Sequence, residues 1–359
     1  MQSEKSPYFS VVMPVYGVEK YIKNAMKSVL NQTFTDLELI MVNDCTPDKS
    51  MEIAEAYAKE DERIKIVHHE KNQGAGMTRN TGTKYAKGKY IWYMDPDDYV
   101  VKDILEKVYD SLQKNPAQLV VFGLYEEYFE KSGEFSYRHE LIPKEKYYRS
   151  SEELRKDIIY LEQQTLYGYP WNKVYDLEYL KSLQLEYGTE TLLEDSIFNI
   201  QYCMEIETMN TLAIPAYHYG KRLENNQTNK FVPEYYEVHE RKIEMLYRQY
   251  EHWGMLTLEV REILGALYAR YIFSAIQRNC DKRAKMSYGK RKAWCKEVFQ
   301  KQLFKELIPY GKAKESKSLQ VLLVLLKKRM VNGSLIMGSI IYVVCTKMPI
   351  LYSRVKSGR

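Results

Sequence analysis

Short apolar runs alternate with longer segments of helical spacing through the first 125 residues. The apolar runs predict buried strands at residues 9–14, 37–42, 63–68, 90–94 and 119–125. The segments between them predict helices at residues 19–30, 48–59, 76–86 and about 102–115, the second of them capped by Asp48. Because strands that alternate with helices pair in parallel through right-handed crossovers, ligands are expected at the carboxyl ends of these strands.

The alternation loosens beyond residue 126 and changes character after about residue 220. Residues 126–220 contain hairpin-like and helical pieces with one more strand near 209–217, whereas 235–278 is mostly helical. The pattern predicts an α/β domain over residues 1–220, with halves at about 8–125 and 126–220. A mainly helical region is predicted at 221–359.

Two apolar runs, at residues 319–326 and 330–346, lie on either side of the basic cluster Lys327-Lys328-Arg329. The second run has 17 residues and includes asparagine, serine and glycine. It falls short of the ~20 apolar residues of a usual spanning helix. Basic residues on both sides favour a helix lying in a membrane surface, so segment 316–351 is the predicted contact. A helix packed in a protein core is the alternative.

Charge is distributed unevenly along the 359 residues. The whole chain carries a net charge of +5, but residues 281–359 contain 19 lysines and arginines against 4 acidic residues, a net of +15. The preceding residues therefore carry a net of −10. A cationic tail indicates an anionic partner, either nucleic acid or a phospholipid surface. No nucleic-acid partner is expected, because the tail lacks the aromatic and basic pattern of a known module and contains apolar runs.

Cysteine usage and the first residues indicate the compartment. The 5 cysteines are odd in number and widely spaced, without a CxxC pair, so neither a zinc site nor a disulfide framework is predicted. Residues 1–10 are polar and charged and lack the apolar stretch of a secretory signal. A cytoplasmic protein, peripheral on the cytosolic face of the cell membrane, is expected.

The strongest chemical signal is the cluster Asp95, Asp97 and Asp98, directly after the fourth predicted strand. Carboxylates this close repel one another unless a cation or solvent relieves them. Oxygen ligands of this kind suit Mg²⁺ or Mn²⁺, which also bind the diphosphate of a substrate. The alternative is a solvated acidic turn that caps the next helix, and Asp98 could do only that.

Four further motifs precede this cluster in order: VVMPVY at 11–16, SVLNQT at 28–33, VNDCTPD at 42–48 and NQGAGMTRN at 72–80. Together with DPDD at 95–98, the string resembles the family 2 glycosyltransferases in order and spacing over roughly residues 8–100. These are inverting enzymes with a GT-A fold, a nucleotide-sugar-binding, Rossmann-like mixed sheet flanked by helices. The resemblance therefore implies that fold and a divalent metal, Mn²⁺ or Mg²⁺.

The resemblance also implies a role for each matching residue. The donor-side set comprises a wall of the base pocket at Pro14, Val15 and Tyr16, an acceptor of a hydrogen bond from the base, typically uracil, at Asp44, and a diphosphate-facing arginine at Arg79. Asp95 corresponds to a contact with the ribose and the metal shell, and Asp97 to the direct metal ligand. Asn43, Cys45 and Thr46 depart from the usual pattern and leave the base open.

A general base is expected near residue 195. The segment TLLEDSIF at 191–198 resembles the family segment whose aspartate is the base, which assigns that role to Asp195 and an orienting or acceptor-contacting role to Glu194. An exposed helix start is the alternative. By resemblance, Trp171, Asn172 and Lys173 contact the acceptor, with core packing as the alternative, and His218 reaches the metal or diphosphate.

The expected function is transfer of a sugar from a nucleotide-diphosphate donor, with a UDP-sugar first in order, to a hydroxyl of a glycan or lipid-linked acceptor. By resemblance, the setting is cell-surface polysaccharide synthesis. A non-catalytic scaffold subunit of a membrane assembly is the alternative, and the complete set of motif residues argues against it. A dinucleotide-binding oxidoreductase is excluded, because no GxGxxG follows the first strand.

Overall fold

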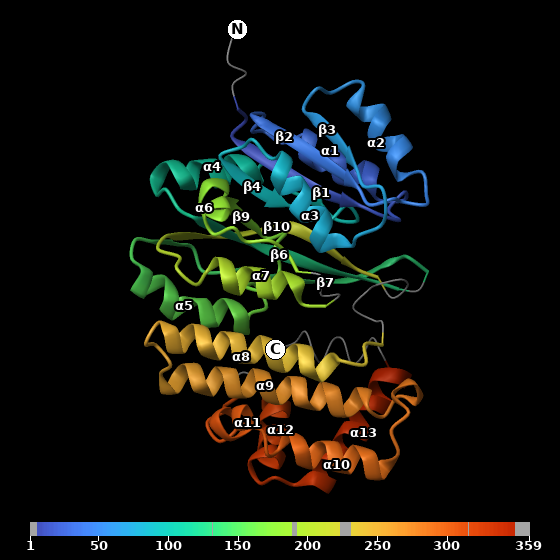
Figure 1. The fold of residues 1–359 in the computed structure, drawn as a ribbon, viewed down its shortest axis with the longest axis vertical. Coiled ribbons are helices and arrows are strands. Elements are labelled where there is room, and N and C mark those ends of the chain that lie inside the picture. The colour runs from blue at the N-terminus through green and yellow to red at the C-terminus, as the bar shows by residue number, and fades with distance from the viewer. Residues whose placement is uncertain (1–5, 131, 189–191, 223–230, 315, 349–359) are drawn as a thin grey trace. The chain divides into compact units, whose positions relative to one another are not determined.

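A computed structural model describes residues 6–130, 132–188, 192–222, 231–314 and 316–348. The chain divides into two compact units, Met1–Asn226 and Gln227–Arg359 (Figure 1). The predicted domain limit at residue 220 falls close to this division. The predicted limit between halves at 125 and 126 falls inside one strand, β6, so one continuous sheet crosses it.

Unit 1 is built on a ten-stranded sheet with the order β3-β2-β1-β4-β9-β6-β10-β5, in which β7 pairs with β6 and β8 with β10. The strands are β1 Phe9–Val15, β2 Leu37–Asn43, β3 Ile64–His68, β4 Tyr90–Tyr93, β5 Tyr99–Val100, β6 Leu119–Phe129, β7 Phe135–Leu141, β8 Lys146–Tyr148, β9 Lys173–Asp176 and β10 Met209–Lys221. The pairs β3–β2, β2–β1 and β1–β4 are parallel, as the alternating pattern predicts.

The register aligns the carboxyl ends of these strands. Val15 of β1 lies opposite Asn43 of β2, and Val12 of β1 lies opposite Tyr93 of β4. All seven residues of β1 are buried, which is why six of them are apolar and only Ser10 is polar. The segments that follow β1, β2 and β4 therefore meet at one edge of the sheet.

Strand β9 departs from the simple pattern. It pairs antiparallel with both β4 and β6, and so separates the fourth strand from the strand at 119–129. The sequence pattern did not predict it, because residues 173–176 are only four and include a lysine and an aspartate. Strand β10 confirms the strand expected near residues 209–217 and extends it to Lys221.

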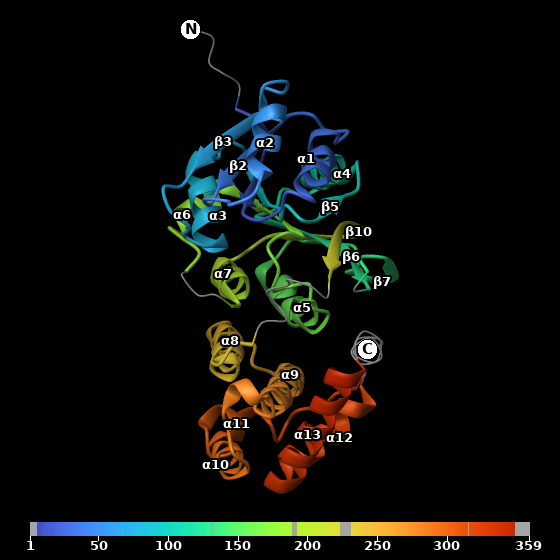
Figure 2. The same ribbon diagram turned by 90° about the vertical axis from the view of Figure 1, so that its right-hand side faces the viewer.

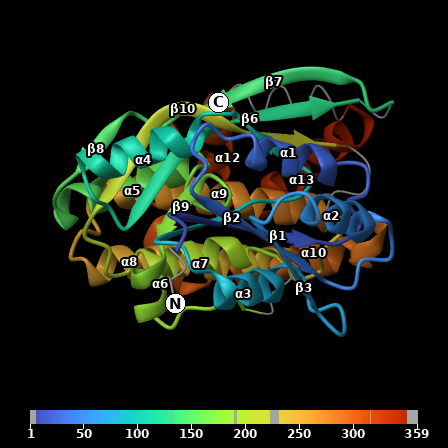
Figure 3. The same ribbon diagram turned by 90° about the horizontal axis from the view of Figure 1, so that it is seen from above.

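The helices of unit 1 are α1 Ile22–Leu30, α2 Ser50–Ala58, α3 Ala75–Tyr85, α4 Ile104–Lys114, α5 Ser151–Gln163, α6 Leu177–Ser182 and α7 Glu194–Tyr202. Figures 2 and 3 show α1 and α4 on one face of the sheet, and α3 and α6 on the other. The first four confirm the predicted helices: α1, α2 and α4 are slightly shorter than predicted, and α3 has the predicted length but begins one residue earlier. Asp48 lies just before α2, and its Oδ1 accepts the Ser50 N–H at 3.1 Å.

Unit 2 is helical, as predicted, with α8 Tyr235–His252, α9 Leu258–Arg278, α10 Tyr288–Val298, α11 Gln302–Leu307, α12 Lys317–Lys327 and α13 Val331–Lys347. Helix α9 is its centre and contacts α8, α11, α12 and α13. Close approach of α13 to α9 depends on Gly338, because a Cβ there would lie 2.2 Å from Ile276. Among the described residues, no helix has both the length and the apolar character needed to cross a membrane.

Candidate active site

The edge at the carboxyl ends of β1, β2 and β4 carries the predicted donor-side residues. Pro14 and Val15 end β1, and Tyr16 follows them with 53% of its surface exposed. The Tyr16 ring is thus available to a ligand, in contrast to Val15, which is fully buried. Asp44 follows β2, and the acidic cluster follows β4.

Asp44 is only 3% exposed and is held by three groups of the next loop. Its Oδ1 lies 2.9 Å from His69 Nδ1 and accepts the Gln73 N–H at 2.8 Å, while its Oδ2 accepts the Gly74 N–H at 2.9 Å. Gly74 has φ +86°, a conformation that favours glycine, and it is the residue directly before α3. Asp44 therefore fixes the loop that leads to Arg79, and its predicted contact with the base stays a prediction.

The unusual residues after Asp44 have local structural reasons. Cys45 adopts φ +57°, a left-handed conformation in which glycine is favoured, and its thiol lies 3.1 Å from the His69 carbonyl oxygen. The Thr46 hydroxyl accepts the Gly17 N–H at 2.8 Å and donates to Asp48 Oδ1 at 2.7 Å. Thr46 thus ties the loop after β2 to the loop after β1, and Cys45 ties it to the residue after β3.

Arg79 joins the acidic cluster to the predicted base. Its Nη1 donates to Asp195 Oδ1 at 2.8 Å, and its Nη2 donates to Asp95 Oδ1 at 2.9 Å. The residue is 4% exposed, and its guanidinium lies 5.4 Å from the centre of the Tyr187 ring. Burial alone lowers the pKa of an arginine, but the charges of Asp195 and Asp95 raise that of Arg79 well above its usual value.

Asp195 lies in the first turn of α7, beside Glu194 and after Leu193, which has φ +62°. Burial is the largest influence on the Asp195 carboxyl and raises its pKa to about 7, with Arg79 opposing and Glu194 and Asp95 reinforcing the shift. The side chain is still 23% exposed. A carboxylate that takes up a proton near neutral pH and is accessible has the properties of a general base.

The three aspartates after β4 have different surroundings. The Asp95 N–H donates to the Tyr217 hydroxyl at 3.1 Å, which orients the start of the cluster. Asp98 is 3% exposed, and its Oδ1 accepts the Gly220 N–H at 2.9 Å. The side chain of Asp97 is 44% exposed and faces Arg222, whose Nη1 lies 3.3 Å from Asp97 Oδ2. Only Asp95 and Asp97 are therefore open to a ligand.

These two carboxylates fit a divalent cation. Burial, followed by the charge of Asp95, raises the pKa of Asp97 to about 6. A bound cation would stabilise the ionised form of Asp97 and offset its repulsion with Asp95. Among the described residues, no group of three or more histidine, cysteine, aspartate or glutamate side chains could hold a metal ion alone. Mg²⁺ is commonly bound by one or two carboxylates together with substrate phosphates, so a partial protein site suits a metal that arrives with a diphosphate.

Asp98→Asn should reduce the loss of stability that the metal-free protein shows as the pH rises. Burial, then the charges of Asp97 and Asp95, raises the pKa of Asp98 well above its usual value. The native state then keeps a proton that the unfolded chain releases above about pH 4, so stability falls as pH rises. Thermal unfolding in EDTA at pH 5 and pH 8 should show a smaller loss for the variant. Equal losses would contradict the raised pKa.

The predicted acceptor residues are buried. Trp171 is 2% exposed and is stacked on Tyr169 and Tyr217, with ring centres 4.5 Å and 4.3 Å away. Asn172 and Lys173 are fully buried, and Lys173 Nζ donates to the Leu166 and Tyr169 carbonyl oxygens and to Asn172 Oδ1. These contacts agree with the core-packing alternative, and the acceptor role stays a prediction.

His218 belongs to a network with Glu127. Its Nδ1 lies 2.9 Å from Glu127 Oε1, and its ring stacks on Tyr99 with centres 4.1 Å apart. Burial lowers the pKa of His218, although Glu127 opposes the shift. Glu127 also accepts from Arg138 at 2.6 Å. The predicted contact of His218 with metal or diphosphate stays a prediction.

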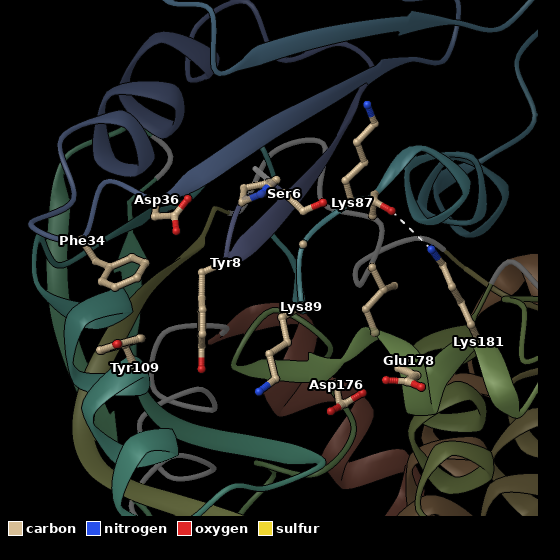
Figure 4. A pocket seen from close by; sticks show the side chains of 14 residues that line it. Ser6, Tyr8, Phe34, Asp36, Lys87, Lys89, Tyr109, Asp176, Glu178 and Lys181 are labelled. Atoms are coloured by element: carbon tan, nitrogen blue, oxygen red, sulfur yellow. Dashed lines mark hydrogen bonds between the residues drawn. The ribbon is translucent and has the colours of Figure 1, made fainter. Parts of the chain in front are cut away.

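A separate pocket of about 760 Å³ lies at the opposite edge of the sheet, where β1 and β4 begin (Figure 4). Tyr8, Phe34 and Tyr109 form its aromatic side. The Lys89 ammonium lies 5.9 Å from the centre of the Tyr8 ring. None of the predicted site residues lines this pocket.

Comparison with known proteins agrees with the motifs. Residues 10–183 match the family described as Glycosyl transferase family 2. The chain is 30% identical over 253 residues to EpsJ of Bacillus subtilis (strain 168), an uncharacterized glycosyltransferase, covering 69% of this chain and 71% of EpsJ. It is 26% identical over 237 residues to the poly(ribitol-phosphate) beta-N-acetylglucosaminyltransferase TarS of Staphylococcus aureus (strain Mu50), covering 64% of this chain and 39% of TarS.

Solved structures show the same architecture. The crystal structure of S. aureus TarS 1–349 in complex with UDP-GlcNAc aligns with a TM-score of 0.64 and 19% identity, covering 93% of this chain and 91% of that chain. Another crystal structure of TarS 1–349 aligns with a TM-score of 0.63 and 20% identity. The likeness confirms the predicted fold, a GT-A sheet with a helical region after it.

Proposed function

Because this chain belongs to the family 2 glycosyltransferases, we propose that unit 1 catalyses an inverting transfer from a nucleotide-diphosphate sugar to a hydroxyl acceptor. That the protein is a glycosyltransferase follows from the family. The stereochemistry, the donor and the acceptor are the proposal.

The main support for the proposal is the contact of Arg79 with two carboxylates. Arg79 connects Asp95 of the acidic cluster, 27% exposed, with Asp195 of α7, 23% exposed. Transfer needs two functions close together. One carboxylate helps to hold the cation that binds the donor diphosphate, and the other accepts the proton of the attacking hydroxyl. A single buried cation that contacts both carboxylates sets that spacing and reduces their mutual repulsion.

The proposed reaction uses Asp195 as the general base. Its carboxylate accepts the proton of the acceptor hydroxyl while that oxygen forms a bond to the anomeric carbon. The bond from that carbon to the diphosphate oxygen breaks with its electron pair, and the nucleoside diphosphate leaves. Attack from the face opposite the leaving group inverts the anomeric configuration. Glu194 is proposed to orient Asp195 or to contact the acceptor.

Asp97 and Asp95 are the residues proposed to hold Mn²⁺ or Mg²⁺, which supplies positive charge to the diphosphate when bound. Arg222 already provides a cation at this point, because its Nη2 donates to the Asp97 carbonyl oxygen at 3.0 Å. Its guanidinium also lies 4.1 Å from the centre of the Tyr21 ring. Arg79, as the resemblance implies, is proposed to face the diphosphate as well.

The donor is proposed to be a UDP-sugar, with its base between Pro14, Val15 and Tyr16 and beside Asp44. TarS, a relative in sequence, has been crystallised with UDP-GlcNAc, which makes this donor the first to test. The proposed acceptor is a glycan or a lipid-linked sugar, with Trp171, Asn172 and Lys173 near it. Transfer is proposed to take place at the cytosolic face of the membrane, as part of polysaccharide synthesis.

Thermal stabilisation by a panel of nucleotide sugars, with Mn²⁺ or with EDTA, tests the proposal. We expect UDP-sugars to raise the unfolding temperature only with the metal, and the same donors to be hydrolysed slowly. NMR of a transfer product should show the anomer opposite to that of the donor. A retained anomer would exclude the inverting mechanism, and a lack of binding by every donor would favour the scaffold alternative.

A further inference from the structure

Helices α12 and α13 of unit 2 pack on each other and on α9 (Figure 2), and α13 also packs on α10. Their buried residues are Leu319, Leu323 and Leu326 on α12, and Ser334, Leu335 and Gly338 on α13. This accounts for less than half of the apolar side chains in either helix. The core-packing alternative from the sequence therefore explains only the inner face.

The outer face of both helices is apolar and exposed. On α13, Ile336, Ile340 and Val343 are 61%, 51% and 48% exposed and follow helical spacing. On α12, Val321 and Val324 are 57% and 42% exposed. We define these five side chains as the outer apolar face. β-Branched aliphatic side chains in such a row have no reason to face water unless another surface covers them.

The charge of residues 316–348 indicates what kind of surface covers the outer apolar face. Residues 316–348 contain no aspartate or glutamate, and their five charged side chains are all basic. Lys327, Lys328 and Arg329 lie together between the two helices, and all three are exposed. Lys317 and Lys347 are exposed at the two outer ends. An apolar row framed only by cations complements an apolar layer beneath negative charges.

A tyrosine adds to this arrangement from α10. Tyr288 is 52% exposed, and its hydroxyl donates to Asn332 Oδ1 at 3.3 Å, in the first turn of α13. Tyrosine is favoured at the boundary between lipid chains and water, because the ring is apolar and the hydroxyl remains hydrogen-bonded.

We propose that the outer apolar face inserts into the head-group region of an anionic phospholipid bilayer, while Lys327, Lys328 and Arg329 contact the phosphates. The helices lie in the surface, since α13 has 17 residues and no described helix can cross the membrane. A second copy of the chain is a poorer occupant. A twofold interface through this face would bring two all-basic segments together, without an acidic residue in residues 316–348 to offset them.

Co-sedimentation of the full chain with vesicles, without any donor, tests the proposal. One set of vesicles is phosphatidylcholine, and the other contains one third phosphatidylglycerol. Ile336→Ser with Ile340→Ser should weaken binding to the anionic vesicles at least about tenfold. The control is Leu258→Ser on α9, which removes one apolar side chain of similar exposure, 59%, outside residues 316–348. The control should bind like the wild type.

Charge is tested separately. Replacement of Lys327, Lys328 and Arg329 by glutamine should weaken binding to anionic vesicles only, and 0.5 M salt should reproduce that loss in the wild type. Replacement of three exposed lysines of unit 1, Lys27, Lys59 and Lys114, should have little effect. Circular dichroism of each variant checks that the helices remain folded.

Two results would overturn the proposal. One is equal binding, or equal absence of binding, by the wild type and the Ile336/Ile340 variant. The other is a wild-type dimer in analytical ultracentrifugation that the same variant converts to a monomer, which would show that a second copy covers the face. Because no donor is present, the result does not depend on the proposed transfer reaction, and a failure of either proposal leaves the other standing.

Discussion

Asp195→Asn should lower the turnover of sugar transfer by roughly 10²–10⁴-fold, the effect of removing a general base. The amide keeps the shape of the side chain and an oxygen for Arg79 Nη1, which donates to Asp195 Oδ1 at 2.8 Å. It cannot accept the proton of the attacking hydroxyl. Donor binding should therefore change little, and initial rates with saturating donor and acceptor should reveal the loss.

A matched control separates this effect from the loss of a negative charge. Asp110→Asn replaces an exposed aspartate on α4 of the same unit and should leave turnover unchanged. If Asp195→Asn transferred sugar at the wild-type rate while it bound the acceptor normally, Asp195 would not be the base.

The pH profile should follow the same carboxyl group. Burial raises the pKa of Asp195 to about 7, and the base acts only when it is deprotonated. The value of kcat/KM should therefore rise with pH through about 7 and level off above it, because that parameter reports the free enzyme. The Asp195→Asn variant should lose this rising limb. A wild-type profile that is flat from pH 5 to 8 would contradict the assignment.

Asp97→Ala should abolish transfer and remove metal-dependent binding of the nucleotide. Asp97 is the most exposed carboxylate of the described acidic cluster, at 44%, and a hard cation loses its main ligand there. Isothermal calorimetry with UDP and Mn²⁺ measures the loss directly, and binding in EDTA gives the metal-independent part. Asp110→Ala is the control for removal of a surface carboxylate. Unchanged metal-dependent binding in Asp97→Ala would exclude Asp97 as a ligand.

The parallel part of the sheet was predictable because its strands are buried on both faces. Residues 9–15 and 37–42 are entirely buried, and each run is apolar except for one residue, Ser10 or Glu38. Strand β9 was not predictable, because Lys173 can lie inside the sheet only where three oxygen atoms accept from its ammonium group. Those acceptors come from a loop whose conformation depends on the folded protein.

The candidate site was also only partly predictable from the sequence. The motifs identify Asp95, Arg79 and Asp195, but no local pattern predicts that one guanidinium contacts both carboxylates. The ion pair of Arg222 with Asp97 likewise joins distant segments, 125 positions apart. His69 could have been found, because a histidine directly after the third strand lies at the sheet edge where ligands are expected.

The contact between Arg79 and Asp195 spans 116 positions, so the proposed reactive centre is a late product of protein synthesis. A ribosome that adds about 5–20 residues per second needs roughly 6–23 s to make the intervening chain. During that interval β1 to β4 can already pair, and Arg79 has Asp95 as a partner but not yet Asp195. A buried guanidinium is stable only with its countercharges in place, so docking of α7 completes the folding of the earlier half. An incomplete nascent chain therefore cannot assemble the centre and consume donor.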